Sequence, residues 1–211
     1  MEKLTLKIIE SEEETLSVLD KIETNLGVKL PFDYAKNSKI VGFFLRGKLS
    51  ACYMLVTRPG FRSLLFVPDK IKNENNFFDN ESFEMMEING LWIGPALKNP
   101  SMQLTVWAHL IKDIFMSKKR FILLMQNSNN KCMERVMNMA NPSLIYEGAP
   151  STMAGERTHQ SIRVSYTTRW SFFLNAPKCL RELFQRQQRT KLSSKKKRHL
   201  QALKQSESEF A

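Results

Sequence analysis

The chain has 211 residues, 42% apolar and 25% charged, which is enough for one globular domain with a substantial core and excludes a disordered composition. No apolar run reaches the roughly 18 to 20 residues that cross a bilayer, and the N-terminus MEKLTLKIIESEEE lacks the apolar core of a signal peptide, so we expect a cytoplasmic protein. The three cysteines lie far apart without zinc-site or disulfide spacing, which indicates free thiols and no metal site.

The net charge of +11 is concentrated towards the C-terminus. Between residues 181 and 204, nine basic residues stand against one acidic residue, which leaves +8 in that segment. A run of this kind predicts salt-dependent attraction to nucleic acid or another anionic partner. The candidate residues for non-specific nucleic-acid contact are Lys195, Lys196, Lys197 and Arg198.

The N-terminal segment predicts a strand followed by a helix. Residues 3–9 alternate apolar and polar side chains, which is typical of a strand. Ser11 and Glu14 then have the spacing of a capping box, and apolar residues recur at helical intervals until Gly27.

The next segment predicts a β-meander. Residues 38–58 hold two apolar runs joined at Arg46-Gly47, which is a hairpin signal. A third run at residues 63–68 can extend the meander, and the polar stretch 72–82 predicts either an excursion from the sheet or a flexible loop.

A strand, a polar turn and a helix start follow. FEMMEINGLWIG predicts a strand over about residues 83–93. Asn99-Pro100-Ser101 offers a capping side chain with proline in the first turn, which indicates that a helix begins here. Because the first N–H groups of a helix lack partners, this turn is a candidate phosphate site. The predicted apolar stripe of the helix is Leu104, Trp107, Ala108, Ile111 and Phe115.

The C-terminal half predicts a buried strand at 120–126, a short amphipathic helix at 130–140 and strands at 143–148 and 161–173. Residues 178–204 indicate a charged helical extension. The complete order, β-α-β-β-β-α-β-α-β-β, predicts a mixed sheet with at least one parallel pair, because the crossover helices connect parallel strands.

This order resembles the GCN5-related N-acyltransferase fold over about residues 3 to 174. In that family the strand before the central helix ends in a loop whose backbone amides hold the pyrophosphate of coenzyme A, here residues 93–103. NSNNKCMERVMNMANPSLIYEG is similar to the family's Asn-led short helix and last pair of strands, with Asn130 at the family's Asn. The family's loop carries glycines, and LKNPSMQL contains none.

The resemblance implies an α/β (α+β) fold with a mixed, mostly antiparallel central sheet flanked by helices. It implies an acyltransferase domain over residues 1–176 and a basic, helical or disordered extension over 177–211. It also implies an N-acyltransferase that moves an acyl group from acetyl-CoA, a longer acyl-CoA or acyl carrier protein to an amine. The residues that would hold this donor are Trp92, Ile93, Lys98, Asn99, Ser101, Met102, Gln103 and Asn130.

Glu87 is the candidate general base. Burial in an apolar strand would raise its pKa and fit it to take a proton from an amine, directly or through a water. The alternative is that Glu87 faces solvent or pairs with a nearby arginine. The family's frequent Tyr on the short helix, an acid towards the departing thiolate, falls on Met137, and Tyr146 or Tyr166 could supply this acid instead.

The stretch MEINGLWIG also resembles two divergent branches of the fold. One comprises acyl-homoserine lactone synthases and N-acyl amino acid synthases, with Glu87 at their Glu and Gly90 where they have Arg. The other comprises Mom-like phage proteins that modify DNA bases, which Leu91-Trp92 fits. Two alternatives to an N-acyltransferase stay open: a phage-type DNA-modifying enzyme, and a catalytically inactive protein of this fold that binds nucleic acid through its C-terminus.

Overall fold

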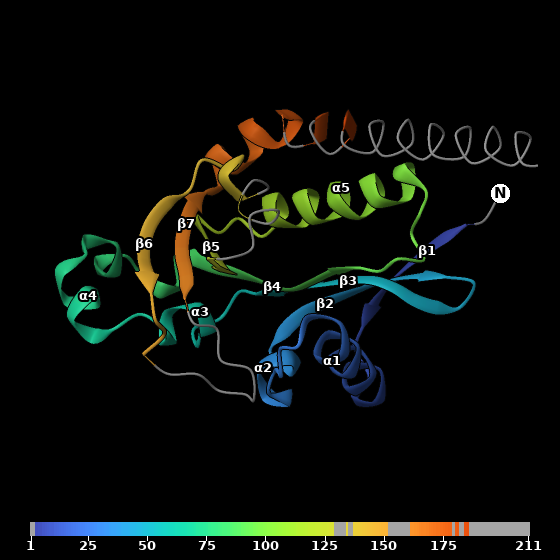
Figure 1. Cartoon of the computed structure of the whole chain (residues 1–211), viewed down its shortest axis with the longest axis horizontal. Helices are drawn as coiled ribbons and strands as arrows, with labels where there is room; N and C mark the ends of the chain where they lie inside the picture. The colour runs from blue at the N-terminus through green and yellow to red at the C-terminus, as the bar shows by residue number, and fades with distance from the viewer. Residues whose placement is uncertain are drawn as a thin grey trace, which may run out of the picture.

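The computed structural model describes residues 3–128, 134, 137–151, 161–178, 180, 181, 184 and 185. Within them, a seven-stranded sheet in the order β1-β2-β3-β4-β5-β7-β6 has α1 and α2 on one face and α5 on the other (Figure 1). The strands are β1 (Leu4–Ile9), β2 (Ser38–Leu45), β3 (Lys48–Val56), β4 (Met85–Ile93), β5 (Phe121–Asn127), β6 (Ser143–Gly148) and β7 (Ile162–Thr168). The helices are α1 (Glu12–Leu26), α2 (Phe32–Lys36), α3 (Arg62–Leu65), α4 (Asp69–Glu74) and α5 (Pro100–Met116), with 3₁₀ turns η1 (Asn76–Asp79) and η2 (Ser82–Glu84).

Helix α1 has the ends that the sequence predicts. The Ser11 hydroxyl accepts a hydrogen bond from the Glu14 amide at 3.3 Å, and Gly27 ends the helix in the left-handed region with φ +67°. Its apolar face packs on β2 and β3 around the fully buried Ile22.

The β2–β3 hairpin is confirmed, and both Arg46 and Gly47 have the positive φ of a tight two-residue turn. The expected extension at residues 63–68 was wrong, because β4 pairs with the edge of β3 that such a strand would need. The chain there forms α3 instead and buries Phe66 and Val67.

The polar stretch 72–82 is ordered into α4, η1 and η2, so the prediction of a flexible loop was wrong. Its apolar anchor is Phe77, which is only 4% exposed. The Phe77 ring stacks on Tyr166 with centroids 4.3 Å apart and meets Phe121 edge-on at 5.6 Å. One buried aromatic side chain thus fixes a segment of otherwise polar composition.

Helix α5 begins where predicted, with Asn99 as its cap and Pro100 in the first turn. Its core face has a different phase from the predicted stripe, since Ala108 is exposed. The side chains buried against the sheet are Val106, Leu110 and Ile114.

The expected parallel pair is β4 with β5, and the other neighbouring strands pair antiparallel. Strand β7 is shorter than predicted and gives way to a helix at Arg169. The Thr168 hydroxyl accepts from the Ser171 amide at 3.1 Å and caps this helix, which runs along α5 (Figure 1). No helix in the described residues is both long and apolar enough to span a bilayer.

We expect Phe77→Ala to lower the free energy of unfolding by about 3–5 kcal/mol, because it leaves a cavity against Tyr166 and Phe121. The matched control is Phe83→Ala, since Phe83 lies in the same segment but is 63% exposed. The control should change stability by less than about 0.5 kcal/mol in urea unfolding. Equal effects of the two substitutions would contradict the docking of this segment.

Candidate active site

Strands β4 and β5 pair over only three residue pairs, the last of which joins Glu87 to Leu123. Beyond it, β4 continues to Ile93 against β3, and β5 continues to Asn127 against β7. Past this point β4 still pairs with β3 and β5 still pairs with β7, but β4 and β5 no longer pair with each other. The backbone groups that face the gap therefore have no strand partner among the described residues, and they can pair with an extended ligand.

Strand β4 bulges where the gap opens. Its pairing with β3 shifts between Cys52 and Met54, and Gly90 adopts φ +57°. A Cβ atom at Gly90 would lie 2.7 Å from the Ile22 side chain, so glycine is needed for both its backbone angle and its small size.

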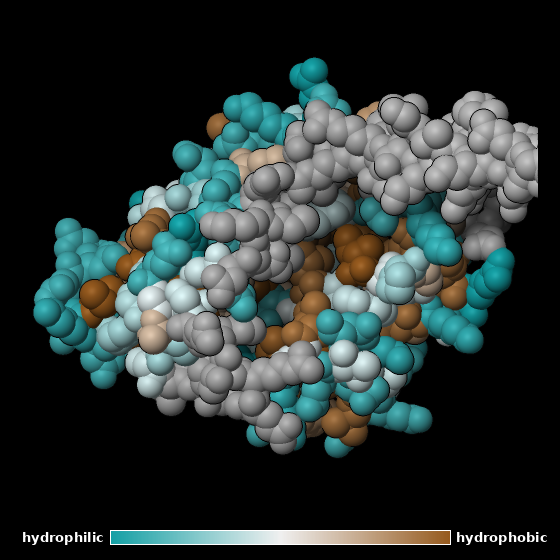
Figure 2. All heavy atoms as spheres, viewed as in Figure 1, coloured by the Kyte–Doolittle hydropathy of each residue, from teal (hydrophilic) through white to brown (hydrophobic). Residues whose placement is uncertain are grey.

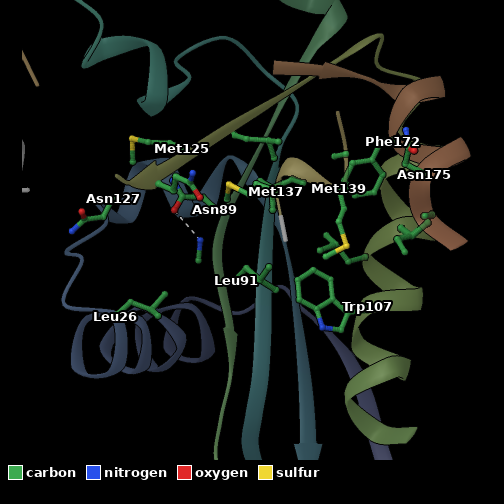
Figure 3. A pocket seen from close by; sticks show the side chains of 18 of the residues that line it. Leu26, Asn89, Leu91, Trp107, Met125, Asn127, Met137, Met139, Phe172 and Asn175 are labelled. Atoms are coloured by element: carbon green, nitrogen blue, oxygen red, sulfur yellow. Dashed lines mark hydrogen bonds between the residues drawn. The ribbon is translucent and has the colours of Figure 1, made fainter. Parts of the chain in front are cut away.

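A cavity of about 350 Å³ occupies the gap and crosses the sheet. Figure 3 shows Leu26 of α1 on one side of the strands and Trp107 of α5 on the other. Around the middle of the molecular face, apolar side chains gather at a hollow (Figure 2). The described lining residues are Leu26, Val28, Ile88, Asn89, Gly90, Leu91, Trp107, Leu110, Ile111, Leu124, Met125, Gln126, Asn127, Met137, Met139, Ala140, Phe172, Asn175 and Ala176.

Two amide side chains in this lining have contrasting surroundings. Asn89 accepts from the Gly90 amide at 2.8 Å and donates to the Tyr34 hydroxyl at 3.1 Å, so it holds the bulge in place. Gln126 is only 8% exposed, and its Oε1 has no hydrogen-bond partner within the described structure. A buried acceptor left in this way is costly unless a ligand or water supplies a donor.

Glu87 is 1% exposed, which rules out the alternative that it faces solvent. Its Oε2 accepts from the Tyr34 hydroxyl at 2.9 Å and from the Arg62 amide at 2.8 Å, and its Oε1 accepts from the Ser63 amide at 3.0 Å. The carboxyl therefore joins α2 and α3 to the last paired residue of β4. Hydrogen bonds within the described residues connect it to the cavity lining through Tyr34 and Asn89.

Burial raises the pKa of Glu87 above its ordinary value of 4.5, and the hydrogen bonds from Tyr34, Ser63 and Arg62 oppose this shift without cancelling it. The direction agrees with the sequence-based expectation. Burial also raises the pKa of Tyr34, and the nearby charge of Glu87 adds to the rise. Tyr34 thus stays protonated at ordinary pH, and its hydroxyl remains a hydrogen-bond donor to Glu87.

The helix start at Asn99 is already well hydrogen-bonded. The Asn99 side chain accepts from the Ser101 amide at 3.0 Å, while its carbonyl accepts from the Met102 and Gln103 amides at 3.1 and 3.2 Å. Lys98 is exposed beside this turn. A phosphate that used these amides would have to displace intrachain acceptors, so phosphate binding at residues 98–103 stays a prediction.

The remaining sequence candidates lie apart from the cavity. Trp92 packs beside the α1 core and Ile93 beneath α5, and neither lines the cavity. Tyr146 and Tyr166 pack in the cluster around Phe77, also outside the lining. Met137, at the position of the family's Tyr, does line it.

Asn130 and the basic residues 195–198 lie outside the described residues, so their roles stay predictions. The same is true of two of the three cysteines, whereas Cys52 is a free buried thiol whose pKa is raised to about 12 by burial. No group of three potential metal-ligating side chains comes together in the part of the chain that the structure describes.

Three residues of the site were missed from the sequence: Tyr34, Asn89 and Gln126. Asn89 and Gln126 are polar residues within apolar strands, which is a signal that the sequence contained. Tyr34 lies 53 residues before Glu87 in the chain, and no local pattern connects the two.

A mixed sheet that opens between two parallel central strands, with a helix after the first of them, is the fold of the GCN5-related N-acetyltransferases, and this chain has that fold. Its sequence matches none of the protein-family models and none of the curated proteins with which it was compared.

Solved structures share the fold at very low identity. FeeM, an N-acyl amino acid synthase from uncultured soil microbes, gives a TM-score of 0.57 at 6% identity over 82% of this chain and 94% of that chain. A GCN5-related N-acetyltransferase from Brucella melitensis gives 0.51 at 9% identity over 85% and 82%. The yncA protein of Salmonella typhimurium, solved with its cofactor acetyl-CoA, gives 0.50 at 8% identity over 79% and 94%.

The raised pKa of Glu87 has a predicted consequence for stability. A group whose pKa is higher in the folded state stabilises the fold below its unfolded pKa, and this contribution is lost as pH rises through the folded pKa. Above about pH 4.5, the unfolding free energy of the wild type should therefore fall relative to that of Glu87→Gln, by up to about 1.4 kcal/mol per pH unit. Urea unfolding of both proteins across this range tests the expectation, and a gap that is constant or moves the other way would contradict it.

Proposed function

We propose that the protein is an N-acyltransferase that takes an acyl group from a thioester donor bound in the gap between β4 and β5. The observation that carries the proposal is the cavity that crosses the sheet where these two strands part. Two substrates can enter it from opposite faces and meet between the strands. The fold shared with acetyltransferases and an N-acyl amino acid synthase supports this reading.

The donor would be an acyl-CoA or an acyl carrier protein. Its pantetheine arm is extended and rich in amides, so it can pair with the unpaired backbone edges of β4 and β5 as an added strand would. The acetyl-CoA in the Salmonella yncA structure, which has the same fold, supports a CoA donor. Lys98 and the helix start at Asn99 follow β4 directly and would face the phosphates.

The reaction would be attack of an amine nitrogen on the thioester carbonyl. A C–N bond forms, the C–S bond breaks, the sulfur leaves as a thiolate, and the proton lost by the amine must be accepted. In our proposal a water carries that proton from the cavity to the Tyr34 oxygen, which lies behind Asn89 and outside the cavity lining, as Tyr34 passes its own proton to Glu87 over the 2.9 Å hydrogen bond between them. Because Asn89 already accepts from the Gly90 amide, the oxyanion would be stabilised by backbone N–H groups of β4 that face the gap beyond the bulge.

Ligand-dependent melting tests donor binding. A ligand that binds only the folded state raises the melting temperature by mass action, so we expect coenzyme A and acyl-CoA to raise it. Each assay should be paired with adenosine 3′,5′-bisphosphate, which has the nucleotide phosphates but no pantetheine arm. A rise in melting temperature with coenzyme A or acyl-CoA but not with the bisphosphate supports binding of the pantetheine arm in the gap. No rise with any acyl-CoA at millimolar concentration would contradict the proposal.

Substitution of Tyr34 tests the proton route. We expect Tyr34→Phe to lower kcat about 100-fold or more with little change in donor affinity, because it breaks the connection from the cavity to Glu87. The comparison is Tyr146→Phe, whose hydroxyl donates to the Ala149 carbonyl at 2.5 Å outside the cavity lining. Thiol release from acyl-CoA in the presence of an amine panel gives the rates. Loss of turnover in Tyr146→Phe but not in Tyr34→Phe would contradict the route.

A further inference from the structure

We infer that the cavity between β4 and β5 takes a fatty acyl chain of about twelve carbons, with an N–H group of the ligand donating to Gln126. This inference rests on the proposed function and names its substrate class: a medium- to long-chain acyl donor whose product is an N-acyl amine. Size, lining and one unpartnered polar atom carry the argument.

The size of the cavity exceeds what an acetyl group needs. An apolar cavity of about 150 Å³ accommodates a benzene molecule, which has six carbons. The cavity here is about 350 Å³, more than twice that volume. In proportion, the whole cavity on both sides of the sheet has room for about twelve to fourteen carbons, which sets the upper limit for the chain.

The lining matches an alkyl chain on the α5 side of the sheet. None of the described lining residues carries a charge. Methionine side chains adapt their shape to flexible ligands, and aromatic rings give broad apolar contact. The apolar residues of this side are Trp107, Leu110, Ile111, Leu124, Met137, Met139, Ala140, Phe172 and Ala176.

The polar requirement of the cavity comes from Gln126. Its buried Oε1 has no partner among the described atoms, whereas the Asn89 side chain is engaged with Gly90 and Tyr34. An acceptor in this position selects a ligand with an N–H group. Two ligands supply one: the N-acyl product, whose N–H adjoins the acyl carbonyl, and the donor, whose pantetheine amide lies beyond the sulfur and two methylene groups.

The chain-length claim is tested by melting the full-length protein with acetyl-, hexanoyl- and dodecanoyl-CoA. We expect affinity to rise up to about fourfold for each methylene that enters the cavity, and to stop rising once it is full. Equal shifts for all three donors would overturn the fatty-chain inference and leave the acyltransferase proposal standing. No shift with any donor would overturn both.

A substitution that fills part of the cavity tests where the acyl chain of the ligand lies. Ala176 is buried in the lining, so Ala176→Phe should abolish the extra affinity for dodecanoyl-CoA and preserve that for acetyl-CoA. The matched control is Leu174→Phe, two residues away on the same helix, where Leu174 is 70% exposed. If Ala176→Phe does not fold, Ala176→Leu gives a smaller filling with the same expected order. An unchanged chain-length profile in a folded Ala176 variant would overturn the placement.

Gln126 is tested with matched product-like ligands, N-dodecanoylglycine and its oxygen-ester analogue, which lacks the N–H group. The wild type should bind the amide about three- to tenfold more tightly than the ester, and Gln126→Leu should remove this preference. If the product amide shows no preference but Gln126→Leu weakens coenzyme A binding by a similar factor, the pantetheine amide is the donor. If neither effect occurs, the role of Gln126 is overturned.

Discussion

Parallel pairing between β4 and β5 ends at Glu87 and Leu123, and the rest of the structure is arranged around the gap that follows. Buried backbone groups need partners, so the groups of β4 and β5 that face the gap need a partner other than a strand, such as a ligand, a side chain or water. Gly90 lets β4 turn away from β5 through a bulge that other side chains would block. The Asn89 side chain then holds the Gly90 amide and fixes the bulge.

Glu87 lies at the branch point itself. As the last β4 residue paired with β5, it accepts hydrogen bonds from Tyr34 on α2 and from the first two amides of α3. The carboxyl thus fastens two helices to the place where the sheet divides. Its raised pKa follows from the same burial, so the stability of the branch point and the proposed proton route depend on one group.

Local patterns in the sequence predicted most of the fold. The helix start at Ser11, the turn at Arg46-Gly47 and the proline-led start of α5 were right because each depends on a few neighbouring residues. The prediction of a strand at 63–68 was wrong because β4 pairs with that edge of β3, and this pairing joins residues far apart in the sequence. The loop prediction at 72–82 failed because the partner of Phe77 is Tyr166, far along the chain.

The sequence predicted a property of the site only where that property depended on one residue and its neighbours in the chain. Burial of Glu87 followed from its apolar strand, but the separation of β4 from β5 and the role of Tyr34 depend on tertiary pairing that no local pattern encodes. Proteins of the same fold share only 6–9% of their residues with this chain, so the same arrangement of strands and helices is built from different residues. Function therefore has to be argued from the site itself.

Backbone hydrogen exchange with and without dodecanoyl-CoA tests the central claim most directly, because it reports where a ligand protects amides. The account predicts slower exchange in peptides that cover Met85–Ile93 and Phe121–Asn127, the two strands that border the gap. A bound ligand that leaves both strands unchanged and protects other segments would contradict it.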